Sequence, residues 1–250
     1  MPKKRLDLLL VEKGLVQSRP RARALIMSGS VLVNNQKVDK PGIFLTGTED
    51  IFIKGQDHPY VSRGGLKLEG ALSSLQVPVK GLFCLDVGAS TGGFSDCLLQ
   101  QGAKHVFAVD VGYGQLAWTL RQDSRVTVLE RTNIRHLSAD ALPCRVDLIT
   151  IDVSFISLKV VVPAVLKFLN KDGQILALVK PQFEVGKGNV GKGGVVRDPS
   201  QHQEVIQNLN DFFTTIGLRC ENTVPSPILG PKGNREFFFL LTASEPQALN

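Results

Sequence analysis

Four charged residues stand at the ends of apolar segments, where a charge is costly unless it is paired or used. They are Lys67, Asp152, Lys180 and Glu236. Taken singly, each could be an exposed cap of a strand or a helix. Together, two lysines and two carboxylates could form a structural group of salt bridges. They could also perform proton transfer, because a desolvated lysine beside a second cation loses its proton more easily.

The elements that must position these residues alternate between strands and helices. Apolar stretches predict strands that end at Asp152 and Lys180 and a last strand that begins at Glu236, while Lys67 lies in an amphipathic helix after a glycine turn. This alternation predicts an α/β fold, a doubly wound, mostly parallel Rossmann-like sheet with its site at the carboxyl edge. The predicted strands cover 105–110, 126–129, 146–152, 173–180, 218–224 and 236–242, and helices cover 94–99, 158–169 and 198–213.

A further strand, ending near Val87, runs into a small-residue turn within the stretch Leu85–Phe94. Glycines in such a turn allow positive φ and close approach of a ligand to the backbone. The spacing differs from the dinucleotide pattern, and no Lys-Ser or Lys-Thr pair follows as in a P-loop. The turn therefore favours a nucleoside ligand without a pyrophosphate, namely S-adenosylmethionine, with Asp86 facing its cationic methionine end.

The second strand of this region ends in another acid, Asp110. It follows Asp86 at close to the roughly 20-residue spacing at which an acid meets ribose hydroxyls. A plain strand-to-helix turn with surface acids is the alternative. The predicted cofactor-binding residues are Asp86, Gly88, Ser90, Gly92, Asp110 and Asn133, and no metal ligands are predicted.

The first 38 residues carry eight Lys or Arg residues against two acids, which accounts for the whole net charge of +6. A basic segment of this kind indicates a polyanionic partner. The segment also has the pattern of a folded unit. An apolar helical stripe runs from Leu6 to Leu15, Ser18 is placed as an N-cap, and a hairpin-like alternation covers 30–38.

Over about residues 5–54 this pattern resembles the S4 RNA-binding domain. The resemblance is carried, in order and spacing, by Gly14-Leu15, Ser18-Arg19, Gly29 and Val33-Asn34. It implies that five cations face RNA phosphates: Arg5, Arg19, Arg21, Arg23 and Lys37. An ordinary helical face with solvated arginines is the alternative. The predicted organisation is an S4-like domain over 1–54, a linker over 55–61 and a catalytic domain over 62–250.

The larger segment resembles the FtsJ-like ribose 2′-O-methyltransferases, whose tetrad is Lys-Asp-Lys-Glu and falls here on the four charged residues named first. The most specific stretches are Ser62–Lys67 and Val179–Glu184. With the S4-like segment, the chain resembles the TlyA (haemolysin A) family over roughly 4–242. That resemblance implies methyl transfer from S-adenosylmethionine to ribosomal RNA in ribosomal subunits, with cytidine as the expected nucleoside.

The resemblance also suggests a role for each member of the tetrad. A ribose 2′-hydroxyl is a poor nucleophile near neutral pH and needs a positioned base. We expect Lys180 to be that base, and Lys67 to be the neighbouring cation that favours loss of its proton and helps to hold the substrate. Asp152 and Glu236 are expected to orient the two lysines and balance their charge. The transfer needs no metal, because the leaving group is a neutral thioether.

Other classes of function remain open at this stage. A membrane-active haemolysin is disfavoured, because neither a secretory signal nor a membrane-length apolar run is apparent. A non-catalytic ribosome-binding or assembly factor would not need the intact tetrad. Pseudouridine synthases also carry S4-like domains, but they do not need the signature at Gly88 and Asp110.

The four cysteines form no C-x-x-C pair, which favours the reducing cytoplasm, and no obligate protein partner is implied.

Overall fold

The computed structural model describes residues 3–16, 18–34, 36–49, 51–53, 58–186, 190–191, 193–230 and 233–244. Contacts divide the chain into two compact units, Met1–Pro59 and Tyr60–Asn250. The division falls within the predicted linker 55–61, of which residues 55–57 lie outside the described residues. Each unit is taken by itself below.

The first unit packs two short helices against small antiparallel sheets. Ser18 begins the second helix as predicted, because its side chain accepts a hydrogen bond from Arg21 N. The predicted hairpin is present with Asn34 at φ +49°, while Asn35 lies outside the described residues. Leu6, Leu10 and other apolar side chains fill a core between helices and sheet. The elements are β1 (Lys4–Arg5), α1 (Leu6–Glu12), α2 (Arg19–Met27), β2 (Val31–Val33), β3 (Gln36–Val38), β4 (Phe44–Leu45) and β5 (Ile51–Ile53).

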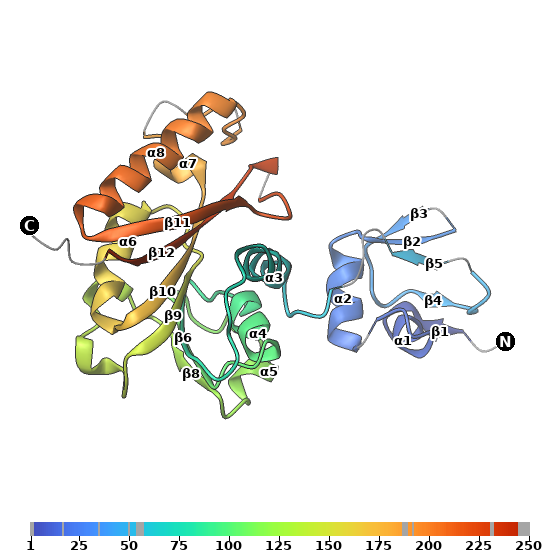
Figure 1. The fold of residues 1–250 in the computed structure, drawn as a ribbon. Helices are drawn as coiled ribbons and strands as arrows, with labels where there is room; N and C mark the ends of the chain where they lie inside the picture. The colour runs from blue at the N-terminus through green and yellow to red at the C-terminus, as the bar shows by residue number, and fades with distance from the viewer. Residues whose placement is uncertain are drawn as a thin grey trace, which may run out of the picture. The chain divides into compact units, whose positions relative to one another are not determined.

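The second unit is built on a seven-stranded sheet in the order β11-β12-β10-β9-β6-β7-β8 (Figure 1). Strands β10, β9, β6, β7 and β8 are parallel to one another, and β12 is antiparallel to both of its neighbours. This confirms the predicted mostly parallel sheet. The strands are β6 (Phe83–Val87), β7 (His105–Val109), β8 (Val126–Leu129), β9 (Val146–Ile151), β10 (Leu169–Val179), β11 (Leu218–Pro225) and β12 (Phe237–Ala243).

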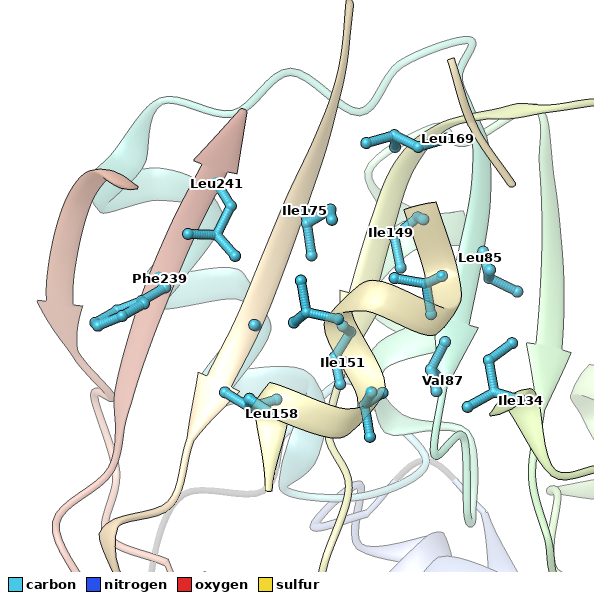
Figure 2. Packing of buried hydrophobic residues seen from close by; sticks show 14 of the residues in the cluster. Leu85, Val87, Ile134, Ile149, Ile151, Leu158, Leu169, Ile175, Phe239 and Leu241 are labelled. Atoms are coloured by element: carbon cyan, nitrogen blue, oxygen red, sulfur yellow. The ribbon is translucent and has the colours of Figure 1, made fainter. Parts of the chain in front are cut away.

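Helices cover both faces of this sheet, with α6 and α8 on one side and α3, α4 and α5 on the other (Figure 1). Successive residues of each buried strand point alternately into the apolar core on one face of the sheet and into the core on the other face. In β10, for example, Ile175 and Ala177 face α6 and α8, and Leu176 faces α3 and α4. Figure 2 shows α6 lying across the first of these cores. The helices are α3 (Gly64–Leu75), α4 (Gly93–Gln100), α5 (Trp118–Arg121), α6 (Leu158–Val165), α7 (Pro181–Glu184) and α8 (Pro199–Thr215), with 3₁₀ turns η1 (Ile134–His136), η2 (Ala139–Ala141) and η3 (Leu166–Phe168).

The chain order places a topological switch point between β6 and β9. From β6 the chain continues outward to β7 and β8, and it then returns to place β9 on the other side of β6. In open α/β sheets, ligands bind outside the carboxyl ends of the strands at such a point. The loops that follow β6 and β9 begin at Gly88 and Asp152, so the fold brings these two residues to the expected binding edge.

Two boundaries differ from the prediction. The helix expected over 158–169 ends at Val165, two residues after Pro163, which lies inside the helix. Leu169 already pairs with β9, and the pairing is irregular from Leu169 to Gln174. The sequence also predicts a basic, glycine-rich loop over 183–197, but the loop begins later, because Pro181–Glu184 forms the short helix α7. Of that loop, residues 187–189 and 192 lie outside the described residues.

Candidate active site

The loop after β6 touches the loop after β9 through a glycine. A Cβ on Gly88 would lie 2.4 Å from the carbonyl oxygen of Asp152, and Gly88 has φ +85°. A side chain there would push the two loops apart, so the spacing of the binding edge depends on glycine. Gly92 has φ +97° and packs on Leu120, whose Cδ1 would lie 2.2 Å from an added Cβ.

Asp110 fixes the same edge from the next strand. Its Oδ2 accepts a hydrogen bond from Ser90 N at 2.7 Å, and its Oδ1 accepts one from Gly112 N at 2.6 Å. The carboxylate therefore ties the loop after β6 to the loop after β7. Asn133 caps η1, with its side-chain oxygen accepting from Arg135 N at 3.1 Å.

These loops enclose a cavity of about 530 Å³, the β7 cleft. It joins polar groups to an apolar wall that includes Val109, Val111 and Ile156. Its size and lining suit a drug-sized ligand, for which clefts of about 300–1,000 Å³ are usual. Of the predicted cofactor residues it contains Gly88, Ser90, Asp110 and Asn133, together with Asp152.

Two predicted cofactor residues lie elsewhere. Asp86 is fully buried on the α4 face of β6, where it accepts hydrogen bonds from Ser95 Oγ at 2.6 Å and Thr150 Oγ1 at 3.1 Å. Residues two apart on a strand face the same side of the sheet, and Cys84 faces α4. Asp86 therefore faces α4 as well, and not the cleft. Gly92 lines neither this cleft nor the adjoining cavity described below, and it packs against Leu120.

Burial dominates the electrostatics of Asp86. It raises the pKa of the carboxyl to about 7, although the hydroxyls of Ser95 and Thr150 offset part of this effect. The group therefore links α4, β6 and β9 with a carboxyl that titrates near neutral pH.

A second cavity of about 380 Å³, the α3 cleft, adjoins the first. The two cavities share Gly88, Ser90 and Asp152. The α3 cleft is otherwise lined by the start of α3, the start of α4 and the loop before β12. Its further residues include Arg63, Lys67, Thr91, Leu229 and Gly230. Asp152 thus stands where two ligands could meet.

The four charged residues form two ion pairs, of which Lys67–Glu236 is buried and Lys180–Asp152 joins a buried lysine to a half-buried carboxylate. Lys67 Nζ lies 2.5 Å from Glu236 Oε2, and Lys180 Nζ lies 2.5 Å from Asp152 Oδ1. Both lysines are 9% exposed and Glu236 is 2% exposed, so the charges are neutralised by pairing rather than by water. Lys180 also donates a hydrogen bond to Ser154 Oγ at 3.0 Å. Each lysine therefore has one carboxylate as its partner.

Two residues at this site were not anticipated from the sequence. Gly230 lies against the Glu236 carboxylate, since an added Cβ would be 2.0 Å from Oε1. Phe155 is 90% exposed in the β7 cleft, has φ +64°, and lies with its ring centroid 4.9 Å from that of Phe183. Residues held in such sparsely populated backbone conformations cluster at active sites and ligand clamps. Its only sequence signal was an aromatic residue following Asp-Val-Ser.

In the first unit, two of the predicted RNA-facing arginines are held by one buried acid. Asp7 is 0% exposed and accepts hydrogen bonds from Arg5 Nε and Arg19 Nε, each at 3.0 Å. These cations lower the pKa of Asp7 to about 2. Arg23 and Lys37 are exposed, and Arg21 is half-buried. All five predicted cations therefore reach the surface, and the buried Asp7 orients Arg5 and Arg19.

The comparisons with known proteins agree with this architecture. The FtsJ-like methyltransferase model matches residues 60–243, and the S4 domain model matches residues 4–51.

The chain belongs to the FtsJ-like methyltransferase family.

Several relatives match nearly the whole chain. The 16S/23S rRNA (cytidine-2′-O)-methyltransferase TlyA of Mycobacterium tuberculosis is 46% identical over 98% of this chain and 92% of its own length. Hemolysin A of Brachyspira hyodysenteriae is 40% identical over 93% of this chain and 97% of its own length. A solved structure from Streptococcus thermophilus, whose given name suggests a hemolysin, has 43% identity and a TM-score of 0.77 over 98% of this chain and 90% of that chain. In the part of this FtsJ-like chain that the structure describes, no helix is long and apolar enough to cross a membrane.

Proposed function

We propose that this protein transfers a methyl group from S-adenosylmethionine to a ribose 2′-hydroxyl of ribosomal RNA. One observation carries the proposal. Asp152, the half-buried partner of the buried Lys180, lines both the β7 cleft and the α3 cleft where they meet. A methyl donor in one cleft and a hydroxyl in the other would face each other across Asp152, beside a lysine able to accept a proton.

The residues of the β7 cleft fit S-adenosylmethionine. Asp110 and Asn133 offer side-chain oxygens for ribose hydroxyls, and Asp152 offers a negative charge near a sulfonium. The apolar wall with Val111 and Ile156 suits a purine ring. When bound, this cofactor supplies an activated methyl group on a cationic sulfur.

The α3 cleft is the proposed place of the target nucleotide. Its lining carries the cations Arg63 and Lys67, which suit a polyanionic strand. Leu229 is 56% exposed at this cleft and offers an apolar contact for a sugar or base.

The proposed reaction is a direct displacement. The ribose oxygen forms a bond to the methyl carbon as the carbon–sulfur bond breaks, and the hydroxyl proton passes to Lys180, which must first release to solvent the proton that it holds in the ion pair with Asp152. Asp152 and Ser154 hold that amine in place, and Glu236 holds Lys67 beside the substrate. Alignment of oxygen, carbon and sulfur by these fixed groups would supply much of the acceleration.

The first unit is the proposed RNA-binding module. Arg5 and Arg19 are pre-oriented by Asp7, and exposed Arg23 and Lys37 add further positive charge. Arginine guanidinium groups bind phosphates through paired hydrogen bonds. The M. tuberculosis relative is named for ribosomal RNA and for cytidine, so we propose the same substrate class for this chain, in the cytoplasm where ribosomes lie.

The test is methyl transfer from radiolabelled S-adenosylmethionine to purified small and large ribosomal subunits that lack the modification. We expect label in an alkali-resistant dinucleotide, because a 2′-O-methyl group blocks cleavage of the adjacent phosphodiester. Cofactor binding without label on either subunit would instead favour a non-catalytic ribosome-binding protein. Absence of cofactor binding would contradict the assignment of the β7 cleft.

A further inference from the structure

Glu184 is a largely buried carboxylate that the proposed reaction does not use. It lies at the end of α7, four residues after Lys180. Its Oε2 accepts a hydrogen bond from Ser157 Oγ at 2.6 Å, and its Oε1 accepts one from Leu158 N at 2.8 Å. Both donors belong to the start of α6, so Glu184 binds the capping hydroxyl and one free amide group of a helix in another part of the chain. Burial raises the pKa of Glu184, and its two hydrogen-bond donors act in the opposite direction.

Glu184 is the last of three contacts between two short segments. We call residues 152–157 the β9 loop and residues 180–184 the α7 segment. At one end of the contact, Lys180 binds Asp152 and Ser154.

In the middle, the ring of Phe183 packs against that of Phe155, with centroids 4.9 Å apart. At the other end, Glu184 binds Ser157 Oγ and the backbone of Leu158. The contacts follow in the same order along both segments, so they fasten the β9 loop to the α7 segment over its whole length.

The β9 loop needs such fastening because its backbone is strained. Phe155 has φ +64°, a left-handed conformation that aromatic L-residues rarely adopt. Its ring is 90% exposed, so burial of the side chain does not hold the conformation. A strained residue persists only where its surroundings over-determine it. Here the contacts on either side of Phe155 are those of Lys180 and Glu184.

We propose that Glu184 is a positioning residue that clamps the β9 loop and thereby sets where Asp152 and Ser154 meet Lys180. Without the clamp, the strained loop relaxes and the amine loses its fixed position beside both clefts. The kinetic part of this inference rests on the proposed methyl transfer. The structural part concerns the loop alone and has its own readout.

The test compares Glu184→Ala with the conservative Glu184→Gln and with Glu204→Ala, which removes an exposed carboxylate on α8. Turnover is measured with ribosomal subunits and S-adenosylmethionine, and backbone hydrogen exchange is measured over residues 153–158. For Glu184→Ala we expect kcat to fall about 10- to 100-fold, because displacement of reacting groups by about 1 Å has effects of that order. The KM for RNA should change less than about threefold, since the RNA-binding residues are untouched.

Exchange over the β9 loop should be faster in Glu184→Ala than in the wild type and unchanged in Glu204→Ala. Glu184→Gln should restore kcat to within about threefold of the wild type, because a glutamine oxygen can accept from Leu158 N and its amide can donate to Ser157 Oγ. The proposal is overturned if Glu184→Ala keeps wild-type kcat, or if kcat falls without faster exchange over the loop. It is also overturned if Glu184→Gln is as impaired as Glu184→Ala.

Should Glu184→Ala fail to fold, Ser157→Ala removes one of the two bonds, together with the cap that Ser157 Oγ gives to Lys159 N, and leaves the carboxylate in place. That variant should show faster loop exchange and a kcat reduced about threefold or more; wild-type values for both would refute the clamp. If the wild-type protein methylates neither subunit, the proposed function fails, and the exchange comparison still decides whether Glu184 holds the loop.

Discussion

Lys180 Nζ and Asp152 Oδ1 lie 2.5 Å apart, and Asp152 is at the same time a wall of both clefts. This one ion pair therefore joins the end of β10 to the end of β9 at the place where two ligands could meet. The equivalent pair of Lys67 and Glu236 joins α3 to the start of β12. Each pair needs the fold to bring together elements that are distant in the sequence, and each can be perturbed separately.

Gly230 sets the position of Glu236. An alanine methyl there would lie 2.0 Å from Glu236 Oε1, so the carboxylate must move away from Lys67. We predict that Gly230→Ala lowers kcat about 10- to 100-fold, by misplacing Lys67 in the α3 cleft. Methyl-transfer kinetics measure this, and cofactor binding in the β7 cleft should be retained. Gly42→Ala is the control, because its methyl meets nothing closer than 3.5 Å; equal kcat in the two variants would contradict the prediction.

Asp86 should make stability depend on pH near neutrality. Its folded pKa of about 7 lies above the ordinary value of 3.8, so between these values the folded protein holds a proton that the unfolded chain releases. The stabilisation is therefore complete below pH 4 and is lost as pH rises through 7. From pH 5 to pH 8, the free energy of unfolding of the wild type should fall relative to Asp86→Asn by about 3 kcal/mol. Urea unfolding at both pH values measures it, and parallel pH profiles would show that Asp86 is not the titrating group.

Replacing different arginines of the first unit should have different effects on the free energy of unfolding. Arg19 is bonded to buried Asp7, so Arg19→Ala should lower the free energy of unfolding by about 1–2 kcal/mol and also weaken RNA binding. Arg23 is exposed, so Arg23→Ala should leave stability unchanged and weaken RNA binding alone. Each lost phosphate contact should reduce the slope of log affinity against log salt by about 0.7–0.9. Thermal melting and RNA titrations at several salt concentrations provide the measurements. Unchanged affinity in Arg23→Ala would remove this residue from the RNA surface.

Much of the fold follows from local sequence patterns. The buried strands are mostly apolar, and Ser18 and Asp198 begin their helices with side-chain caps at the predicted positions. The carboxyl-edge location of Asp152 and Lys180 followed from the strands alone. The pairing of the two carboxylates with the two lysines was expected from charge balance, and the structure shows which carboxylate goes with which lysine.

What could not be predicted depends on long-range packing. Asp86 was expected in the cofactor cleft, but its side of the strand faces α4, and only the packed helix reveals this. The contact of Gly230 with Glu236 depends on the path of a loop. The exposed, positive-φ conformation of Phe155 depends on two segments that are fastened together, and no local propensity indicates it.

The central claim is tested most directly by single-turnover methyl transfer with Lys180→Ala. The matched control is Lys171→Ala, which removes an exposed lysine from the same strand, β10. Removal of a general base costs about 10²- to 10⁴-fold in rate. We predict a loss of this size for Lys180→Ala with cofactor binding retained, and a wild-type rate for Lys171→Ala. A Lys180→Ala rate equal to that of the control would contradict the proposed role of the Lys180–Asp152 pair.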